Sequence, residues 1–256
     1  MAPPEPVRVL HVTDPHLFED AGGSLRGTVT YATLAAVVAH IRQQDWPADF
    51  VAMTGDTVQD DTAGAYEHFR GLMTPLGLPV LVVPGNHDVR PLMQVALSAP
   101  PFRYCESVRL RGWLVAGIDS CIDGHAGGRI SDTELQRLRT LLRDAKAEHV
   151  AICLHHPPLP MHSRWLDEVG LYNAGDFLEI IAAAGNVRVA IFGHVHQSFD
   201  DYRGATRIIG TPSTCAQFKP HSDEFALDSN PPAYRRIALH PDGSVTTELI
   251  PVNMDE

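Results

Sequence analysis

Hydrophobic residues gather in five short runs along the chain, and each run ends at a polar turn. The runs cover Val7 to Val12, Phe50 to Thr54, Pro79 to Pro84, Val150 to Leu154 and Val187 to Phe192. Apolar runs of this length, bounded by turn residues, are typical of buried strands. The sequence therefore predicts five strands that each deliver polar side chains at their C-terminal ends, where an open α/β sheet carries its active site.

Segments with helical periodicity separate these strands. The first has apolar residues at i, i+3, i+4 and i+7, which places them on one helical face: Leu34, Val37, Val38 and Ile41. Trp46-Pro47 ends this segment. Further helices are expected over about 64–73, 90–97 and 174–184. The β-α-β-α-β order predicts a right-handed, mostly parallel sheet.

The pattern changes after the third strand. Tyr104 to Leu110 and Trp113 to Ile118 are separated by Arg111-Gly112, a spacing typical of a hairpin that adds antiparallel strands and begins a second sheet. Ser131 to Glu134 has the S-x-x-E form of a capping box and opens a helix with a leucine-rich buried face. Further short strands predict an antiparallel tail, over 206–210, 234–239 and 245–250.

No Ser/Gly-rich linker or run of charges divides the 256 residues. We therefore expect one domain over residues 1–256, with a metal-ligand core at about 7–200 and a C-terminal tail at about 201–256 that contributes to the substrate site. The net charge of -11 argues against binding to nucleic acid or to an anionic membrane surface, because such binding needs clustered Lys and Arg. An anionic substrate must therefore be attracted locally.

The four cysteines show no CxxC pairing, and Cys153 lies within a predicted strand. We therefore expect reduced, buried thiols rather than disulfides. The proline-rich start, Met1 to Pro6, lacks the basic and apolar regions of a signal peptide, and no run approaches the roughly 18 apolar residues of a membrane span. These features predict a cytoplasmic protein, and they leave its oligomeric state open.

The polar turns carry seven oxygen and imidazole donors, which are Asp14, His16, Asp56, Asn86, His155, His194 and His196. Seven donors are enough for two cations if one carboxylate is shared, and Asp56 is the natural bridge. Mixed carboxylate and imidazole donors without thiolates favour Zn, Mn, Fe or Co over Ca or Mg. Two such ions about 3.5 to 4 Å apart would hold a bridging hydroxide and clamp the attacking and leaving oxygens of an in-line displacement.

The charge of such a centre favours phosphate chemistry. Two dications, two aspartates and one hydroxide leave one net positive charge, which a singly charged phosphodiester neutralises. An Asp in place of the neutral Asn86 would cancel this attraction. His87 is not needed as a ligand and could protonate a leaving alkoxide, because histidine ordinarily titrates near pH 6.5.

Six further histidines are interpreted as structural or surface residues. His156 follows His155 on a strand, so it points to the opposite face and is interpreted as a support. The others are His11, His40, His68, His149 and His240.

Taken together, the motifs resemble those of the calcineurin-like metallophosphoesterase superfamily in order and content, from Val9 to His196. They are D-x-H at 14–16, GD at 55–56, GNHD at 85–88, HHPP at 155–158 and GHVH at 193–196. Each motif alone occurs by chance in many chains, so their value is joint. The resemblance implies an α/β fold built as a four-layer α-β-β-α sandwich of two mixed sheets.

The resemblance also implies how the donors divide between two metal ions. One ion is held by Asp14, His16, Asp56 and His196. The second is held by Asp56, Asn86, His155 and His194. His87 takes the place of the family's catalytic histidine, and the two ions are divalent or mixed-valence transition metals, such as iron or manganese.

Within the superfamily the chain resembles the class III cyclic-nucleotide phosphodiesterases, and most of all the bacterial enzymes that act on 3′,5′-cyclic AMP. The similarity extends through Trp165-Leu166-Asp167, Asn173-Ala174-Gly175 and the segment from Thr211 to His221. It implies hydrolysis of cyclic AMP to 5′-AMP. The substrate contacts that it implies are His16, Asn86, His87, His196, Asn173 and His221. The alternative for the last two is that Asn173 caps the following helix and His221 is an ordinary loop residue.

Two departures from the wider superfamily narrow this interpretation. Many of its phosphatases carry an acid three residues after the bridging Asp, but here that position is Gln59, followed by Asp60. The GDxVDRG pattern of protein Ser/Thr phosphatases is missing, which disfavours a phosphoprotein substrate. Two alternative functions stay open: a broader phosphodiesterase acting on glycerophosphodiesters or 2′,3′-cyclic nucleotides, and a non-catalytic scaffold, against which the complete donor set argues.

Overall fold

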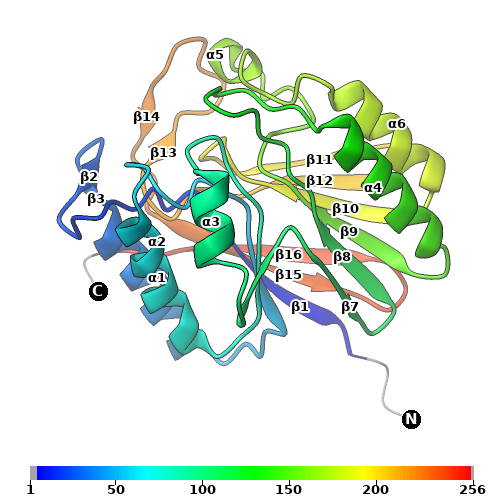
Figure 1. The fold of residues 1–256 in the computed structure, drawn as a ribbon, viewed down its shortest axis with the longest axis horizontal. Helices are drawn as coiled ribbons and strands as arrows, with labels where there is room; N and C mark the ends of the chain where they lie inside the picture. The colour runs from blue at the N-terminus through cyan, green and yellow to red at the C-terminus, as the bar shows by residue number, and fades with distance from the viewer. Residues whose placement is uncertain (1–4, 255–256) are drawn as a thin grey trace.

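Two six-stranded mixed sheets pack face to face, and helices cover both outer faces (Figure 1). The computed structural model describes residues 5–254, so most of the proline-rich start lies outside the described residues. The first sheet contains β1 (Val7–Val12), β4 (Phe50–Met53), β5 (Val80–Val82), β6 (Phe102–Tyr104), β15 (Ala233–Leu239) and β16 (Val245–Pro251). Its order across the sheet is β16-β15-β1-β4-β5-β6.

The second sheet has the order β11-β12-β10-β9-β8-β7. Its strands are β7 (Ser107–Leu110), β8 (Trp113–Gly117), β9 (His149–Cys153), β10 (Val187–Phe192), β11 (Phe199–Arg203) and β12 (Thr206–Gly210). Two small hairpins stand apart from both sheets: β2 (Ser24–Leu25) with β3 (Thr28–Val29), and β13 (Gln217–Phe218) with β14 (Leu227–Asp228).

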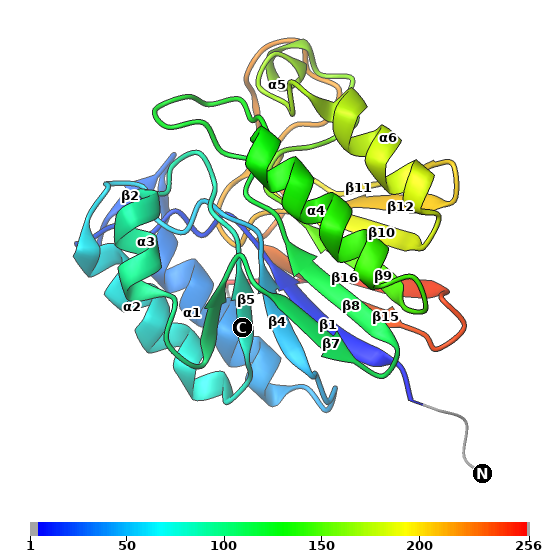
Figure 2. The same ribbon diagram turned by 45° about the vertical axis from the view of Figure 1, so that its right-hand side comes forward.

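The helices divide between the two outer faces, as Figure 2 shows from a second side. Over the first sheet lie α1 (Thr30–Gln43), α2 (Ala63–Met73), the 3-10 turn η1 (Thr74–Leu76) and α3 (Arg90–Ala96). Over the second lie α4 (Asp132–Asp144), the short α5 (Arg164–Asp167) and α6 (Ala174–Ala184). The helices predicted over 64–73, 90–97 and 174–184 are therefore present with ends shifted by at most one residue, whereas α1 ends at Gln43, before the predicted end at Trp46-Pro47.

Three layers of apolar side chains hold these four layers together. Alternate residues of β1 face opposite ways, because side chains alternate along a strand: Val9 packs between the sheets and Leu10 against the helices. Between the sheets, Leu81 of the first belongs to the same buried cluster as Ala151 and Ile191 of the second. The predicted four-layer α-β-β-α sandwich of two mixed sheets is confirmed.

Parallel pairing brings the polar turns to one edge of the sandwich. In the first sheet β1, β4 and β5 run parallel, and in the second β8, β9, β10 and β12 do so. Parallel strands carry their C-terminal ends at the same edge of a sheet. The turns after β1, β4, β5, β9 and β10 are those that carry the predicted ligands.

Two of the predicted antiparallel segments are arranged differently from the prediction. The predicted strand from Tyr104 to Leu110 is divided, because Cys105 takes a left-handed φ of 48° and the chain passes from the first sheet at β6 to the second at β7. The C-terminal strands do not form a separate antiparallel tail. β12 pairs parallel with β10, whereas β15 and β16 return to the first sheet beside β1.

The capping box that opens α4 is half formed. The Ser131 hydroxyl accepts a hydrogen bond from the backbone N–H of Glu134 at 3.1 Å. The Glu134 carboxylate instead accepts from the backbone N–H of Asp119 and from the guanidinium of Arg137. Glu134 therefore fastens α4 to the turn after β8.

All four cysteines are free thiols. Within residues 5–254, no helix combines the length and the apolar character needed to cross a membrane.

We expect Ser131→Ala to lower the free energy of unfolding by about 1 kcal/mol, the usual cost of removing an N-cap hydroxyl. Urea denaturation of wild type and variant measures this difference. Thr140→Ala, at a position within α4 that makes no cap, is the matched control. Equal stability of Ser131→Ala and wild type would contradict the cap's contribution.

Candidate active site

Five of the seven predicted metal ligands have left-handed backbone conformations. The φ angles are 53° for Asp14, 48° for His16, 53° for Asp56, 69° for His194 and 45° for His196. Asp and His adopt such angles more readily than most residues, though still at a cost. The turns after the strands are therefore shaped to aim these side chains at a common point.

The first donor group comes from the turns after β1, β4 and β10. The Nε2 atoms of His16 and His196 lie 3.1 Å apart, and Nε2 of His196 lies 3.4 Å from Oδ1 of Asp14. Oδ2 of Asp56 lies 3.6 Å from Nε2 of His16. All four side chains are buried, and they are the four predicted for one ion.

The second donor group joins the turns after β4, β5, β9 and β10. Nε2 of His155 lies 3.1 Å from Oδ1 of Asn86 and 3.1 Å from Nδ1 of His194. It also lies 3.5 Å from Oδ2 of Asp56. The same carboxylate oxygen of Asp56 is thus close to both groups, as the predicted bridge requires.

These separations fit the coordination shell of a transition metal. Two metal–ligand bonds of about 2.1 Å at 90 to 109° place their donor atoms about 3.0 to 3.4 Å apart. The donor pairs above lie 3.1 to 3.6 Å apart, and atoms of Asp14, Asp56 and His155 all fall within 4.8 Å of one another. The residues present therefore fit two ions.

Outer hydrogen bonds fix which nitrogen faces the centre in three of the four imidazoles of the donor groups. Nδ1 of His155 donates to the carbonyl of Thr54 at 2.7 Å, and Nδ1 of His196 donates to the carbonyl of Ala216 at 2.7 Å. Nδ1 of His16 donates to Oε1 of Gln59 at 2.9 Å. Such partners hold the opposite nitrogen free for a metal.

His156 and His194 differ in their outer contacts. Both ring nitrogens of His156 have partners, Ser120 at 2.9 Å and the carbonyl of Ala126 at 3.2 Å, which fits the predicted supporting role. Nε2 of His194 is buried without a partner among the described residues, while its Nδ1 faces the donor group.

The charges of the donor side chains offset one another in part. Burial lowers the pKa of His194 to about 3 and that of His16 to about 4, so both are neutral imidazoles. Burial also disfavours charge on His155, but Asp56 and Asp14 together raise its pKa to about 9. Burial raises the pKa of Asp56, yet the adjacent His155 and His16 bring it well below the ordinary value.

His87 lies at the edge of the donor groups and is half-buried. Its ring centroid is 4.9 Å from that of His16, and its donor atoms fall within 4.8 Å of those of His16 and Asp56. Its backbone N–H donates to Oδ1 of Asp56 at 2.9 Å. Its assignment as an acid rather than a ligand stays a prediction.

Two glycines allow the turns to approach this closely. A Cβ on Gly85 would lie 2.2 Å from the backbone N and from Oδ1 of Asp56, and one on Gly193 would lie 2.6 Å from Oδ2 of Asp14. No side chain fits at such distances. The glycines of GNHD and GHVH therefore leave room for the two buried carboxylates.

Asp88, the last residue of GNHD, was not among the predicted site residues. Its carboxylate accepts hydrogen bonds from the backbone N–H of Gly85 and of Thr57 and from the Tyr66 hydroxyl. It thereby ties the turn that carries Asn86 and His87 to the turn that carries Asp56. The sequence signal that could have identified Asp88 is its position directly after the candidate site residues Asn86 and His87.

His11 was interpreted as an ordinary strand residue, but it belongs to a buried polar chain that reaches the site. Its Nδ1 lies 2.7 Å from the Thr211 hydroxyl and its Nε2 lies 2.8 Å from the Thr54 hydroxyl. The Thr54 hydroxyl donates to that of Thr13, which donates to Asp14. This chain fixes the carboxylate of Asp14 from behind.

Asp60 makes its hydrogen bonds within the neighbouring loops rather than with His87. It accepts hydrogen bonds from the backbone N–H of Glu19 and from the Thr62 hydroxyl, and among the described residues no hydrogen bond links it to His87. The neighbouring Gln59 instead holds His16.

Two of the predicted substrate contacts lie away from the donor groups. The side chain of Asn173 is buried and pairs with both the N–H and the carbonyl of Ile130; it makes no cap to α6. His221 is exposed, 6.4 Å from the His162 ring. Their contacts with a substrate stay predictions, whereas His16, Asn86, His87 and His196 all line the central cavity.

The donor groups open into a cavity of about 340 Å³. Its polar end is formed by the six predicted site residues His16, Asp56, Asn86, His87, His194 and His196. The rest of its lining is mostly apolar: Ala126, Trp165, Leu166, Val169, Phe218 and Phe225, with Arg26 at the rim. A volume of this size suits a small-molecule ligand.

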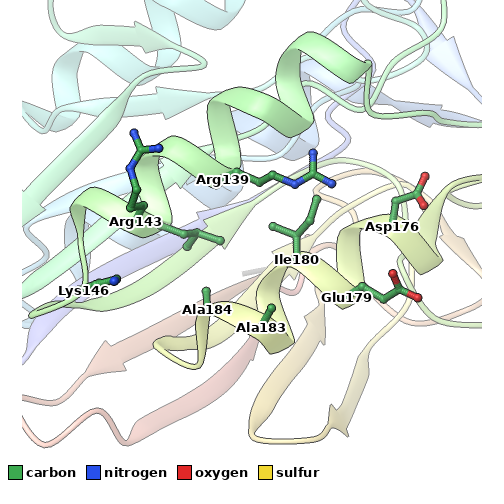
Figure 3. A pocket seen from close by; sticks show the side chains of 9 residues that line it. Arg139, Arg143, Lys146, Asp176, Glu179, Ile180, Ala183 and Ala184 are labelled. Atoms are coloured by element: carbon green, nitrogen blue, oxygen red, sulfur yellow. The ribbon is translucent and has the colours of Figure 1, made fainter.

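A larger hollow of about 470 Å³ lies elsewhere, between α4 and α6. Figure 3 shows Arg139 and Arg143 of α4 on one side and Asp176 and Glu179 of α6 on the other. It shares no residue with the donor groups, so it has no place in their chemistry.

The fold and the paired donor groups are those of a metallophosphoesterase. The model of the calcineurin-like phosphoesterase family matches residues 7–198. The chain therefore belongs to the calcineurin-like phosphoesterase family, whose members use divalent metals.

Its relatives include enzymes named 3′,5′-cyclic adenosine monophosphate phosphodiesterase CpdA. The chain is 38% identical to that of Escherichia coli K12 over 245 residues, which cover 95% of this chain and 89% of the relative. It is 36% identical to that of Haemophilus influenzae over 244 residues, with the same coverage. Among solved structures, a dimetal phosphatase of Danio rerio has the same fold, with a TM-score of 0.67 at 15% identity, covering 98% of this chain and 100% of that chain.

We expect Asp56→Ala to lose both metal ions and Asn86→Ala to weaken mainly one, because only Asp56 lies against both donor groups. Metal content per chain, measured after desalting from a Mn²⁺-containing buffer, gives the result. Asp45→Ala, an exposed aspartate just after α1, is the control and should retain two ions. Two tightly held ions in Asp56→Ala would contradict the bridging assignment.

Proposed function

We propose that the chain hydrolyses 3′,5′-cyclic AMP to 5′-AMP at a centre of two transition metal ions. The observation that carries this proposal is the convergence of two donor groups on Asp56 beside His87. It occurs in a chain that is 36 to 38% identical to CpdA phosphodiesterases over 95% of its length.

Two bound ions, proposed to be Fe, Mn, Zn or Co, would lower the pKa of water and neutralise phosphodiester charge. Asp56 and Asp14 are the two negative charges of the site, and Asn86 contributes an oxygen without adding a third. Two dications, these two carboxylates and one hydroxide would leave one net positive charge, which a singly charged phosphodiester neutralises.

His87 is proposed as the general acid that protonates the departing 3′ oxygen. It lines the cavity and is half-buried, so it can meet both substrate and solvent. Asp88 supports this placement, because it accepts hydrogen bonds from Gly85 and Thr57 and so fixes the turn of His87 against the turn of Asp56. His16, whose ring lies 4.9 Å from that of His87, and His196 are proposed to contact the phosphodiester as well.

We also propose that residues 1–256 act as one unit, with about 201–256 contributing to the substrate site. Phe218 and Phe225 support this, since both line the cavity beside residues of the core. A cytoplasmic location is proposed with it, supported by the four free cysteines. Cyclic AMP is the proposed binding partner, and we propose that the chain binds neither nucleic acid nor a membrane.

A substrate panel tests the proposed reaction against its rivals. We expect kcat/KM for 3′,5′-cyclic AMP to exceed that for 2′,3′-cyclic AMP and for glycerophosphocholine on one metal-reconstituted sample, with cyclic GMP as the comparison of bases. A preference for either of the two rivals would replace the proposed substrate. Failure to cleave even bis(p-nitrophenyl) phosphate would favour the scaffold.

We expect His87→Ala to retain two ions yet to lose roughly 10² to 10⁴ in kcat on cyclic AMP, the usual range for general acid catalysis. Its defect on bis(p-nitrophenyl) phosphate should be much smaller, because nitrophenolate departs without a proton. His240→Ala, at a histidine bonded to Thr246, is the control. Equal defects on both substrates with metals intact would assign His87 to charge stabilisation.

A further inference from the structure

The cavity has a second end that the metal chemistry does not use. Opposite the donor groups, three aromatic rings and one guanidinium line it, from Trp165, Phe218, Phe225 and Arg26. They come from four separate segments: α5, β13, the turn before β14 and the β2–β3 hairpin. Figure 1 shows these segments gathered at one end of the molecule.

The three rings meet as a corner rather than as a stack. Trp165 and Phe218 are 5.2 Å apart at 70°, Trp165 and Phe225 5.3 Å apart at 76°, and Phe218 and Phe225 5.3 Å apart at 72°. Rings at such angles leave faces and edges open to a further planar group. Phe225 is 42% exposed although it is apolar, so the corner retains surface to bury.

The corner is joined directly to the donor groups. Phe218 stacks on the imidazole of His196, with centroids 4.1 Å apart and planes at 7°. A ligand that binds its phosphodiester beside His196 therefore extends toward the aromatic corner. Because the phosphate of a 3′,5′-cyclic nucleotide is fused to its ribose, its base lies at a fixed short distance from the phosphorus.

Arg26 covers the corner from outside. Its guanidinium lies 4.7 Å from the centroid of Phe225, and among the residues lining the cavity it is the only Lys or Arg. It occupies the first position of the two-residue turn Arg26-Gly27, where φ is positive at both residues, 53° and 86°. Such turns favour Asn-Gly, so an arginine at this position does not stabilise the turn.

We propose that Trp165, Phe225 and Arg26 form the subsite that binds the nucleobase and selects base-bearing phosphodiesters. This rests on the proposed function, since it assigns the base of that substrate. The rings offer stacking and edge contacts to a planar heterocycle, and the guanidinium adds a planar cationic wall over it. Glycerophosphodiesters have no ring to place there.

The substrate comparison uses 3′,5′-cyclic AMP and the base-free ribose 3′,5′-cyclic phosphate, which has the same reacting ring. Stacking contributes about ten- to hundredfold per base, so wild type should prefer cyclic AMP by that factor in kcat/KM. Phe225→Leu and Trp165→Leu keep apolar volume but lose the ring. We expect each to lose most of this preference through KM, and to act on the base-free substrate as wild type does.

Arg26→Asn isolates the guanidinium without endangering the fold, because asparagine suits the first position of this turn better than arginine. We expect it to raise KM for cyclic AMP several-fold and to leave the base-free substrate unchanged. Arg207→Asn is the matched control, since its guanidinium lies over an aromatic ring too, 5.9 Å from the centroid of Tyr202, but neither residue lines the cavity.

Inhibition separates the base subsite from the phosphodiester site. We expect adenosine to inhibit hydrolysis of bis(p-nitrophenyl) phosphate by wild type and to lose this effect in Phe225→Leu, while inhibition by inorganic phosphate stays equal in both. If wild type does not cleave cyclic AMP, the proposed function fails, yet adenosine inhibition still tests the subsite. Equal losses on both cyclic substrates, or adenosine inhibition unchanged in Phe225→Leu, would overturn the subsite.

Discussion

Two carboxylates buried within 4.8 Å of each other, Asp14 and Asp56, are the constraint that organises this chain. Like charges in a buried site repel strongly and must be offset. Backbone N–H groups offset part of this repulsion, because His194 donates to Asp14 and His87 donates to Asp56. The imidazole of His155 offsets more of it, since the two carboxylates raise its pKa to about 9. These devices hold the negative charge in place but do not cancel it, so the pair remains a site for cations.

The same constraint explains where the backbone is strained. The left-handed conformations at Asp14, His16, Asp56, His194 and His196 cost roughly 1 to 2 kcal/mol each. Strain of this size persists only where the surroundings over-determine the conformation. Here the turns are anchored on strands buried on both faces, between one core shared by the two sheets and two cores shared with helices. The two sheets and their helices therefore hold a few short turns in strained conformations. Gly85 and Gly193 allow these turns to approach one another, because a side chain at either position would clash with Asp56 or Asp14.

The strand ends and the polar turns that follow them could be predicted from the sequence because they depend on local order, whereas the four-layer sandwich was implied by the family resemblance of the motifs. An apolar run followed by a polar turn predicts a strand end, and parallel strands bring such ends together, so His16 and His196 could be placed near each other across 180 residues. The parts that escaped prediction depend on packing between distant segments. His11 has an ordinary strand position, and only the facing sheet supplies its partner Thr211. Likewise, no local signal shows that Arg26 meets Phe225, or that Cys105 turns the chain from one sheet into the other.

Chemistry and recognition thus come from different kinds of segment. The donors lie on turns directly after central strands, where a shift of one residue would move a ligand out of a shell only about 2 Å in radius. The aromatic corner lies on connections: α5, the β13–β14 hairpin and the β2–β3 hairpin. Phe218 joins the two regions, because its ring stacks on His196. Since loops tolerate change that strand ends do not, substitutions at Trp165, Phe225 or Arg26 can alter the group accepted beside the phosphodiester while the donor geometry stays fixed. Substitution at Phe218 cannot be separated in this way, because it would also free the imidazole that the ring holds against Asp14.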